Sequence, residues 1–149
     1  PNNAYAYYNR GLAYYNKGQY DRAIEDYNKS IALDPNDAYN NRGNAYDRKG
    51  QYDRAIEDYT SAIVINPNHA NAYYNRGAAY AKKGQYDRAI EDYNKVIALD
   101  PNDADAYYNR GLAYAIKENM GRAISDFQKA CDMGDENGCT NLQRALKNR

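Results

Sequence analysis

Hydrophobic and polar positions alternate along the chain with the period of an amphipathic helix. In residues 20–33, apolar and tyrosine side chains recur every three or four positions, with charged and amide side chains between them. Gly18 suits the left-handed turn past a helix end and separates this segment from an earlier one at residues 4–17. Asp34-Pro35 ends the segment, because proline disfavours helix in the residue before it. The pattern predicts two helices, and the second has one apolar face made of Tyr20, Ala23, Ile24, Tyr27 and Ile31.

The same pair of helices recurs along the chain. Prolines follow one another at intervals of 34, 32 and 34 residues, at Pro1, Pro35, Pro67 and Pro101. Asn36 and Asp37 are expected to cap the first helix of the second pair. One helix pair cannot bury its apolar face alone, but stacked pairs can. The sequence therefore predicts a single all-α domain over 1–149, with repeats at approximately 4–35, 36–67, 70–101 and 104–134 and a capping helix at approximately 136–147.

Each repeat matches the pattern W-x2-L-G-x2-Y, A-x3-F and P of the tetratricopeptide repeat, which has a 34-residue period. The first repeat supplies Tyr7, Arg10, Gly11, Tyr14, Ala23, Tyr27 and Pro35, and the other three supply the equivalent residues up to Phe127. The chain thus resembles the tetratricopeptide repeat family. The resemblance implies an α-solenoid, a right-handed superhelix of antiparallel helix pairs, with a concave groove lined by the first helices. It also implies a scaffold or peptide-binding role rather than catalysis.

Composition narrows the classes of partner. Twenty basic and twenty acidic residues give zero net charge, which argues against nucleic acid or an anionic membrane as the main partner. The longest apolar stretch, residues 62–65, is far shorter than the ~20 residues of a membrane-spanning helix. The chain has one histidine and two cysteines and carries no phosphate-binding glycine loop. We therefore expect no enzyme activity, no cofactor and no metal site.

Arginine takes the leucine position of the pattern in all four repeats. An arginine in a packed seam needs a partner, and the second helix of each repeat offers an aspartate. The alternative is that the guanidinium extends past its own aliphatic stem into water. The predicted pairs are Arg10–Asp26, Arg42–Asp58, Arg76–Asp92 and Arg110–Asp126.

An asparagine lies two residues before each repeat glycine, at Asn9, Asn41, Asn75 and Asn109. In the family this position faces the concave surface, and the row resembles the asparagine ladder in the repeats of O-GlcNAc transferase. A carboxamide offers a donor and an acceptor, so it can bind a peptide backbone whatever the ligand's side chains. The alternative is that these side chains only solvate or cap locally. The other predicted groove residues are Tyr5, Tyr8, Leu12, Asn40, Asn44, Tyr74 and Tyr108.

The carboxylate clamp that binds heat-shock chaperone tails in this family requires cations that the chain lacks. On the first three repeats, the clamp positions are Tyr8, Leu12, Asn41, Asn71 and Asn75. Without cations the clamp loses its charge-assisted hydrogen bonds. We therefore expect a protein or peptide partner, but not a chaperone tail.

Both ends of the array carry alternatives. Cys131 and Cys139 resemble the cysteines that join consecutive helices in Sel-like repeats, which implies a possible disulfide; a reduced buried pair is the alternative. A reduced pair would suit the cytoplasm, and a bridged pair the periplasm or export. The first helix has no cap, and the connection after Pro35 is two residues shorter than the one after Pro67. Self-association, including domain swapping, is therefore a second possible function, and a designed or consensus-like array without a natural ligand is a third.

Overall fold

The computed structural model describes residues 3–35 and 38–147, and within these ranges it contains nine α-helices and no strand. The predicted all-α fold class is confirmed. The expected caps Asn36 and Asp37, with the short connection after Pro35, lie outside the described residues, as does Pro1. The helices are α1 (Ala4–Asn16), α2 (Tyr20–Leu33), α3 (Ala38–Arg48), α4 (Tyr52–Ile65), α5 (Ala70–Lys82), α6 (Tyr86–Leu99), α7 (Ala104–Ile116), α8 (Met120–Asp132) and α9 (Glu136–Lys147).

Local chemistry fixes the ends of these helices. The Asn3 carboxamide caps α1 by accepting hydrogen bonds from the backbone N–H of Tyr5 and Ala6, at 3.0 and 3.3 Å. Gly18 ends the first turn with φ +72°, where a side chain would be strained. Glu118 takes the equivalent place in the fourth repeat with φ 59°, so the last turn keeps the conformation without its glycine. Such a conformation costs a non-glycine residue roughly 1 kcal/mol.

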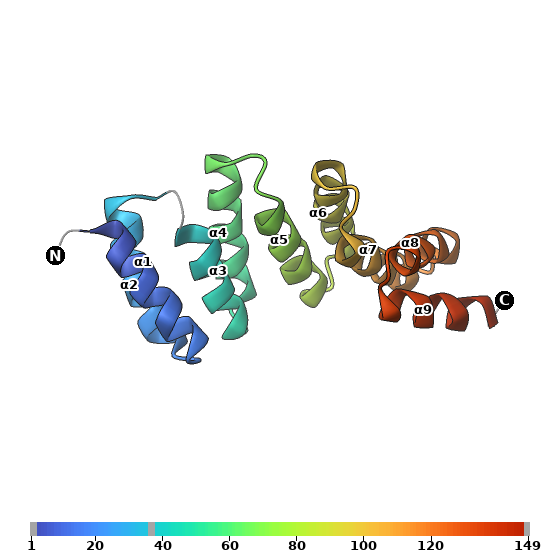
Figure 1. Cartoon of the computed structure of the whole chain (residues 1–149), viewed down its shortest axis with the longest axis horizontal. Helices are drawn as coiled ribbons and strands as arrows, with labels where there is room; N and C mark the ends of the chain where they lie inside the picture. The colour runs from blue at the N-terminus through green and yellow to red at the C-terminus, as the bar shows by residue number, and fades with distance from the viewer. Residues whose placement is uncertain (1–2, 36–37, 148–149) are drawn as a thin grey trace. The chain divides into compact units, whose positions relative to one another are not determined.

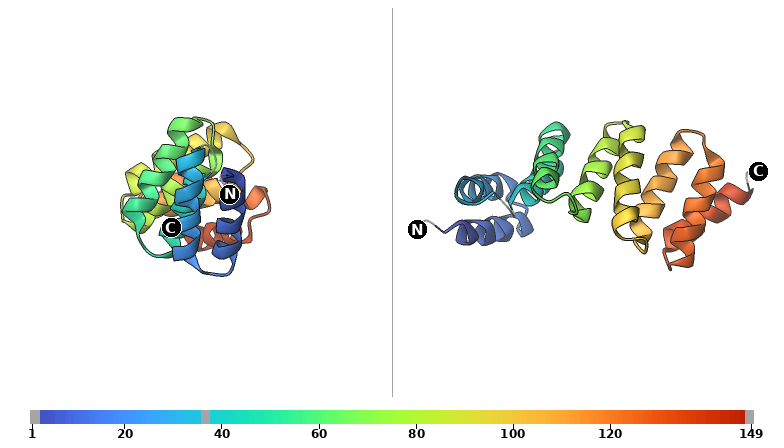
Figure 2. Two further views of the ribbon diagram at one scale, coloured as in Figure 1. Left: turned by 90° about the vertical axis from the view of Figure 1, so that its left-hand side faces the viewer. Right: turned by 90° about the horizontal axis from the view of Figure 1, so that it is seen from above.

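The chain divides into two compact units, Pro1–Ala79 and Tyr80–Arg149. In the first unit α1 packs on α2, α2 on α3, and α3 on α4 (Figure 1). In the second unit α6 packs on α7, α7 on α8, and α8 on α9 (Figure 2). Helices α1 to α4 in the first unit and α6 to α9 in the second therefore each pack on their neighbours in the chain.

In the first, second and fourth repeats, an aromatic ring of the second helix packs against the glycine of the first helix. In the first unit Tyr27 and Tyr59 are almost completely buried, at 0% and 1% exposure. A Cβ added to Gly11 would lie 2.9 Å from the Tyr27 ring, and one added to Gly43 would lie 2.7 Å from the Tyr59 ring. In the second unit Phe127 meets Gly111 in the same way, at 2.8 Å. The repeat glycine thus lets the first helix approach the ring on the second.

Candidate functional site

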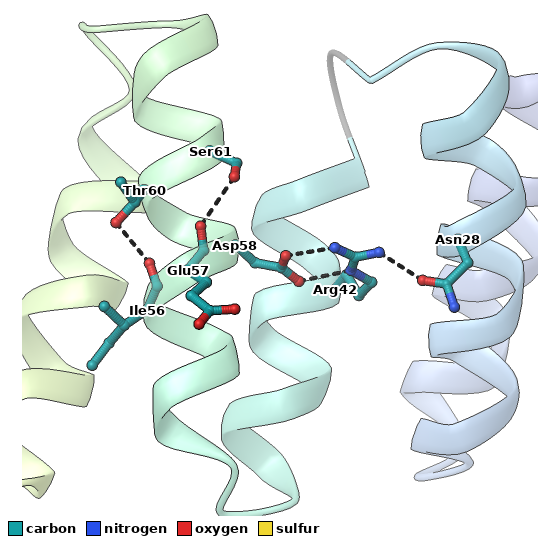
Figure 3. Close-up of polar contacts among 7 residues, drawn as sticks. All are labelled: Asn28, Arg42, Ile56, Glu57, Asp58, Thr60 and Ser61. Carbon is teal, nitrogen blue, oxygen red and sulfur yellow. Dashed lines mark hydrogen bonds and ion pairs between the residues drawn. The ribbon is translucent and has the colours of Figure 1, made fainter.

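Three arginine–aspartate pairs join the two helices of a repeat. Arg42 on α3 donates from Nε to Asp58 Oδ2 at 2.8 Å and from Nη2 to Asp58 Oδ1 at 2.6 Å (Figure 3). Arg10 makes the same bidentate contact with Asp26 at 2.6 and 2.8 Å. Arg110 does so with Asp126 at 2.8 and 2.7 Å. Two parallel charge-assisted bonds fix the orientation of the carboxylate as well as its charge.

The fourth expected pair, Arg76 with Asp92, stays a prediction. Arg76 lies in the first unit and Asp92 in the second. Within the first unit, Arg76 Nη1 donates to Thr60 Oγ1 of the preceding repeat at 3.1 Å.

Tyrosine rings cover the faces of the same guanidinium groups. The Cζ atom of Arg42 lies 5.4 Å from the ring centroid of Tyr39 and 5.9 Å from that of Tyr46. Arg54 on α4 covers Tyr46 at 5.6 Å. Cations over tyrosine rings at these distances are attracted by the electron-rich ring face. The tyrosines at the tryptophan and tyrosine positions of the repeat pattern therefore hold the arginine that replaces leucine.

Two of these three arginines also donate a hydrogen bond to the preceding repeat. Arg42 Nη1 donates to Asn28 Oδ1 on α2 at 2.6 Å (Figure 3), and Arg110 Nη1 donates to Asn94 Oδ1 on α6 at 2.6 Å. Sequence reasoning missed these contacts. The available signal was a polar residue two positions after each repeat aspartate, at Asn28, Thr60 and Asn94.

Burial and charge act differently on two of the aspartates. Hydrogen bonds from Arg10 hold the pKa of Asp26 below its ordinary value, against the opposing effect of burial. Burial raises the pKa of Asp58, and the hydrogen bonds from Arg42 oppose that rise. The Arg10 side chain is 55% exposed and the Arg42 side chain 20% exposed. The second pair therefore lies in drier surroundings than the first.

The asparagine row contacts neighbouring first helices. Asn41 Nδ2 on α3 donates to the Tyr8 hydroxyl on α1 at 2.7 Å. Asn75 Nδ2 on α5 donates to Asn40 Oδ1 and Asn44 Oδ1 on α3, at 3.2 and 3.1 Å. These bonds link successive first helices and fix the amide nitrogens toward their neighbours.

The remaining predicted groove residues are less uniformly placed. Asn9 and Tyr5 are exposed on α1, Tyr5 at 69%. Asn109 donates back to the Asp105 carbonyl of its own helix at 2.8 Å. The Tyr108 hydroxyl accepts from Asn141 on α9 at 3.4 Å, as Tyr8 does from Asn41. Tyr74 is half-buried on α5.

A small cavity lies among these residues in the first unit. It has a volume of about 60 Å³ and is lined by Leu12, Tyr15, Tyr27, Asn41 and Asn44. Three of the five, Leu12, Asn41 and Asn44, are predicted groove residues. The sequence also indicates Tyr15 as a further residue of this face in the first repeat, but it indicates Tyr27 only as a core residue of the second helix.

The tail adds one further helix after the fourth repeat. The structure joins Cys131 on α8 to Cys139 on α9 by a disulfide, with the two Cα atoms 4.5 Å apart. Leu142 on α9 packs with Ala123 and Phe127 of α8. Leu142 directly follows Asn141, as Arg110 follows Asn109, so the last helix has leucine where the full repeats have arginine.

Groups of side chains suited to hold a metal ion and helices suited to cross a membrane are both absent from the described residues. In the described part of the chain, no group of three or more histidine, cysteine or acidic side chains could hold a metal ion. Among the same residues, no helix combines the length and apolar character needed to cross a bilayer.

Comparisons with known proteins agree with the repeat pattern. Tetratricopeptide repeat models match residues 4–37, 26–57 and 104–133, and a TPR repeat model matches residues 43–84 and 79–117. A crystal structure of MamA is 34% identical with a TM-score of 0.87, covering 91% of this chain and 81% of that chain. A fragment described as MamA 41-end from Desulfovibrio magneticus RS-1 is 28% identical with a TM-score of 0.82, covering 89% and 76%. No curated protein gives a significant match.

Proposed function

This chain belongs to the tetratricopeptide repeat family, whose fold makes it a protein-interaction scaffold, and we propose that it binds an extended peptide or protein segment without catalysing a reaction. The binding surface is the face of the first helices that carries the asparagine row. The tyrosines beside that row supply contact area. Tyrosine and asparagine suit such a surface, because they combine rigid contact area with adaptable hydrogen bonding.

The observation that carries the proposal is the fixed orientation of Asn41 and Asn75. The side-chain amide of each donates at least one hydrogen bond to a neighbouring first helix. Among the residues that the structure describes, neither Oδ1 atom has a hydrogen-bond partner. Two carbonyl acceptors are thus held in place before any ligand arrives, and such preorganisation lowers the entropic cost of binding. Peptide N–H groups are the matching donors.

Charge favours a neutral stretch of ligand over a terminal carboxylate. The guanidinium groups of Arg42 and Arg110 already bind aspartates and the asparagine of the preceding repeat. These guanidinium groups therefore already donate hydrogen bonds within the protein. A carboxylate buried without cations would lose the charge-assisted bonds that offset its desolvation.

The test is a random peptide display screen on the purified chain, run beside the double variant Asn41→Ala/Asn75→Ala. We expect a recurrent peptide family whose affinity falls by on the order of 1–3 kcal/mol in the variant, because two hydrogen-bonding side chains are removed. Isothermal titration with a synthetic peptide from that family gives the number.

The double variant also loses contacts between repeats, so a matched control is needed. Asn28→Ala removes one hydrogen bond between repeats, the one from Arg42, but outside the proposed groove. We expect this variant to lower the stability of the fold and to leave the affinity for the peptide unchanged. Equal affinity of the peptide for the wild type and the double variant would contradict the assignment of this site.

Self-association is a second candidate, favoured by the exposed side chains of α1. The Arg10 side chain is 55% exposed, and among the described residues it donates to Asp26 alone, whereas Arg42 and Arg110 each also donate to an asparagine. A hollow of about 380 Å³ lies beside it, lined by Asn3, Ala6, Tyr7 and Arg10. A second copy seated there would give a mass that rises with concentration in sedimentation velocity, and a constant monomer mass would exclude it.

A further inference from the structure

The hydroxyl of Tyr27 is buried without a hydrogen-bond partner among the described residues. The side chain is 0% exposed. Burial, together with the neighbouring Tyr8 and Tyr15, raises the pKa of this phenol, so it stays protonated and remains a donor. A buried donor left unpaired forfeits the hydrogen bond that it made to water in the unfolded chain. Such a group is an unusual feature of a folded protein and calls for an acceptor.

Equivalent positions in other repeats are satisfied within the protein. In the second repeat the Tyr59 hydroxyl donates to Asn44 Oδ1 at 2.8 Å. Leu12 takes the place of Asn44 in the first repeat, and a leucine side chain cannot accept a hydrogen bond. In the fourth repeat Phe127 has no hydroxyl to satisfy. The first repeat alone combines the phenol with a leucine among these three.

The 60 Å³ cavity adjoins this group. Tyr27 and Leu12 both line it, and by analogy with Tyr59 and Asn44 the Tyr27 hydroxyl is directed at Leu12. Asn41 brings a carbonyl oxygen, because its amide is bonded to Tyr8. Asn44 brings its amide group, because its carbonyl oxygen already accepts from Tyr59 and Asn75. The lining therefore combines hydrogen-bond donors and an acceptor with the apolar surfaces of Leu12 and Tyr15.

We propose that this cavity binds the side chain of a threonine or serine in the segment that occupies the groove, an inference that rests on the proposed peptide-binding function. The Tyr27 hydroxyl is closed to water in the free chain, so a small shift of the Leu12 or Tyr15 side chain opens it on binding. The ligand hydroxyl then accepts a hydrogen bond from Tyr27 and donates one to the Asn41 carbonyl. The threonine methyl group packs against Leu12 and Tyr15. The combination of Tyr27 and Leu12 thus makes the groove prefer one class of ligand side chain, whereas the rest of the surface binds the peptide backbone whatever its sequence.

Size and charge select this class of side chain. A cavity of about 60 Å³ holds roughly two water volumes, against the ~150 Å³ cavity that admits benzene. Leucine and aromatic side chains are therefore too large. Alanine would leave the Tyr27 hydroxyl unpaired, and a carboxylate would enter without a cation. A hydroxyl satisfies both the donor and the acceptor of the lining.

The experiment uses the display screen on the full chain, followed by a synthetic peptide from the selected family and its copy with valine in place of the selected threonine. Valine keeps the shape and removes only the hydroxyl. We expect threonine or serine to be enriched at one position, and the valine copy to bind wild type about fivefold more weakly, as one hydrogen bond predicts. Against Tyr27→Phe or Leu12→Asn the two peptides should bind equally, because the first variant removes the donor and the second supplies an internal acceptor.

Tyr59→Phe is the matched control, since it deletes the same hydroxyl one repeat later, where Asn44 already satisfies it. It should lower the melting temperature and keep the threonine preference, whereas Tyr27→Phe should not lower the melting temperature. Peptides that require Asn75 but show no threonine or serine preference would overturn this inference and leave the proposed function standing. The absence of any enriched peptide would overturn both.

Discussion

The first and second repeats of the first unit contain the same residues in different surroundings. Arg10–Asp26 and Arg42–Asp58 are both bidentate, with donor–acceptor distances between 2.6 and 2.8 Å. Among the described residues, only Arg42 of these two arginines donates a further hydrogen bond, to Asn28 of the preceding repeat at 2.6 Å. Only Arg42 is mostly withdrawn from water. A pair that looks identical within one repeat therefore differs in how many of its polar groups a neighbour satisfies.

The same contrast holds on the other side of the repeat. The Tyr59 hydroxyl is bonded to Asn44, which also accepts from Asn75 of the next repeat. The Tyr27 hydroxyl has no partner among the described residues. Hydrogen-bond networks of this kind are costly when partly satisfied. The comparison indicates that the second repeat has the more completely satisfied network of the two, and that the first leaves a buried hydroxyl unpaired among the described residues.

The largest expected effect follows from removing an aspartate. Asp58→Ala leaves Arg42, only 20% exposed, without its carboxylate, and we expect a loss of about 3 kcal/mol in the free energy of unfolding. Asp26→Ala should cost less, because the Arg10 side chain is 55% exposed and can be solvated. Urea unfolding of the full chain, followed by circular dichroism, measures both. Equal losses would mean that the preceding repeat does not alter the seam.

The fold and the family could be predicted from the sequence because the repeat determines both at once. Recurring glycine, alanine and proline positions predicted stacked helix pairs, and the all-α fold and the family membership are confirmed. In the structure the glycine positions have a plain reason, since Gly43 has no room for a Cβ beside Tyr59. Packing of this kind repeats with the sequence, so a pattern reveals it.

The finer polar contacts could not be predicted in the same way. Helical spacing places Asn28 on a face but does not say that its carbonyl meets Arg42 from the next repeat. Likewise, the row of asparagines suggested free amides, whereas the Asn41 and Asn75 nitrogens contact neighbouring first helices. Which atoms come into contact depends on side-chain rotamers and on the distance between helices. Neither can be deduced from the spacing of residues in the sequence.

A smaller effect is expected from exchanging the residues that face the two tyrosines. Asn44→Leu gives the second repeat the arrangement of the first. It removes the acceptor of the Tyr59 hydroxyl and one of the two acceptors of the Asn75 amide. We expect a loss of about 2 kcal/mol, measured by urea unfolding. The reverse exchange, Leu12→Asn, should raise stability by about 1 kcal/mol, because it supplies an acceptor to Tyr27. Stability that falls in both variants would show that the two repeats do not share one geometry.

The smallest expected difference lies in the pH dependence of the two pairs. Arg10 lowers the pKa of Asp26 below its ordinary value of 3.8, so this carboxylate stabilises the folded chain above that pH and the contribution is lost as pH falls through the folded pKa. Burial raises the pKa of Asp58, so the folded chain binds this proton more tightly than the unfolded chain. Its contribution is complete below the unfolded value and is lost as pH rises through the folded pKa.

The two signs can be measured by unfolding the wild type, Asp26→Asn and Asp58→Asn in urea from about pH 3 to about pH 7. The stability difference between wild type and Asp26→Asn should grow with pH, and the difference for Asp58→Asn should shrink. The asparagine replacements keep the size of the side chain, so the pH dependence reports the charge rather than the packing. Parallel curves would mean that the drier surroundings of Asp58 do not outweigh its hydrogen bonds to Arg42, and that the two pairs are electrostatically equivalent despite their different neighbours.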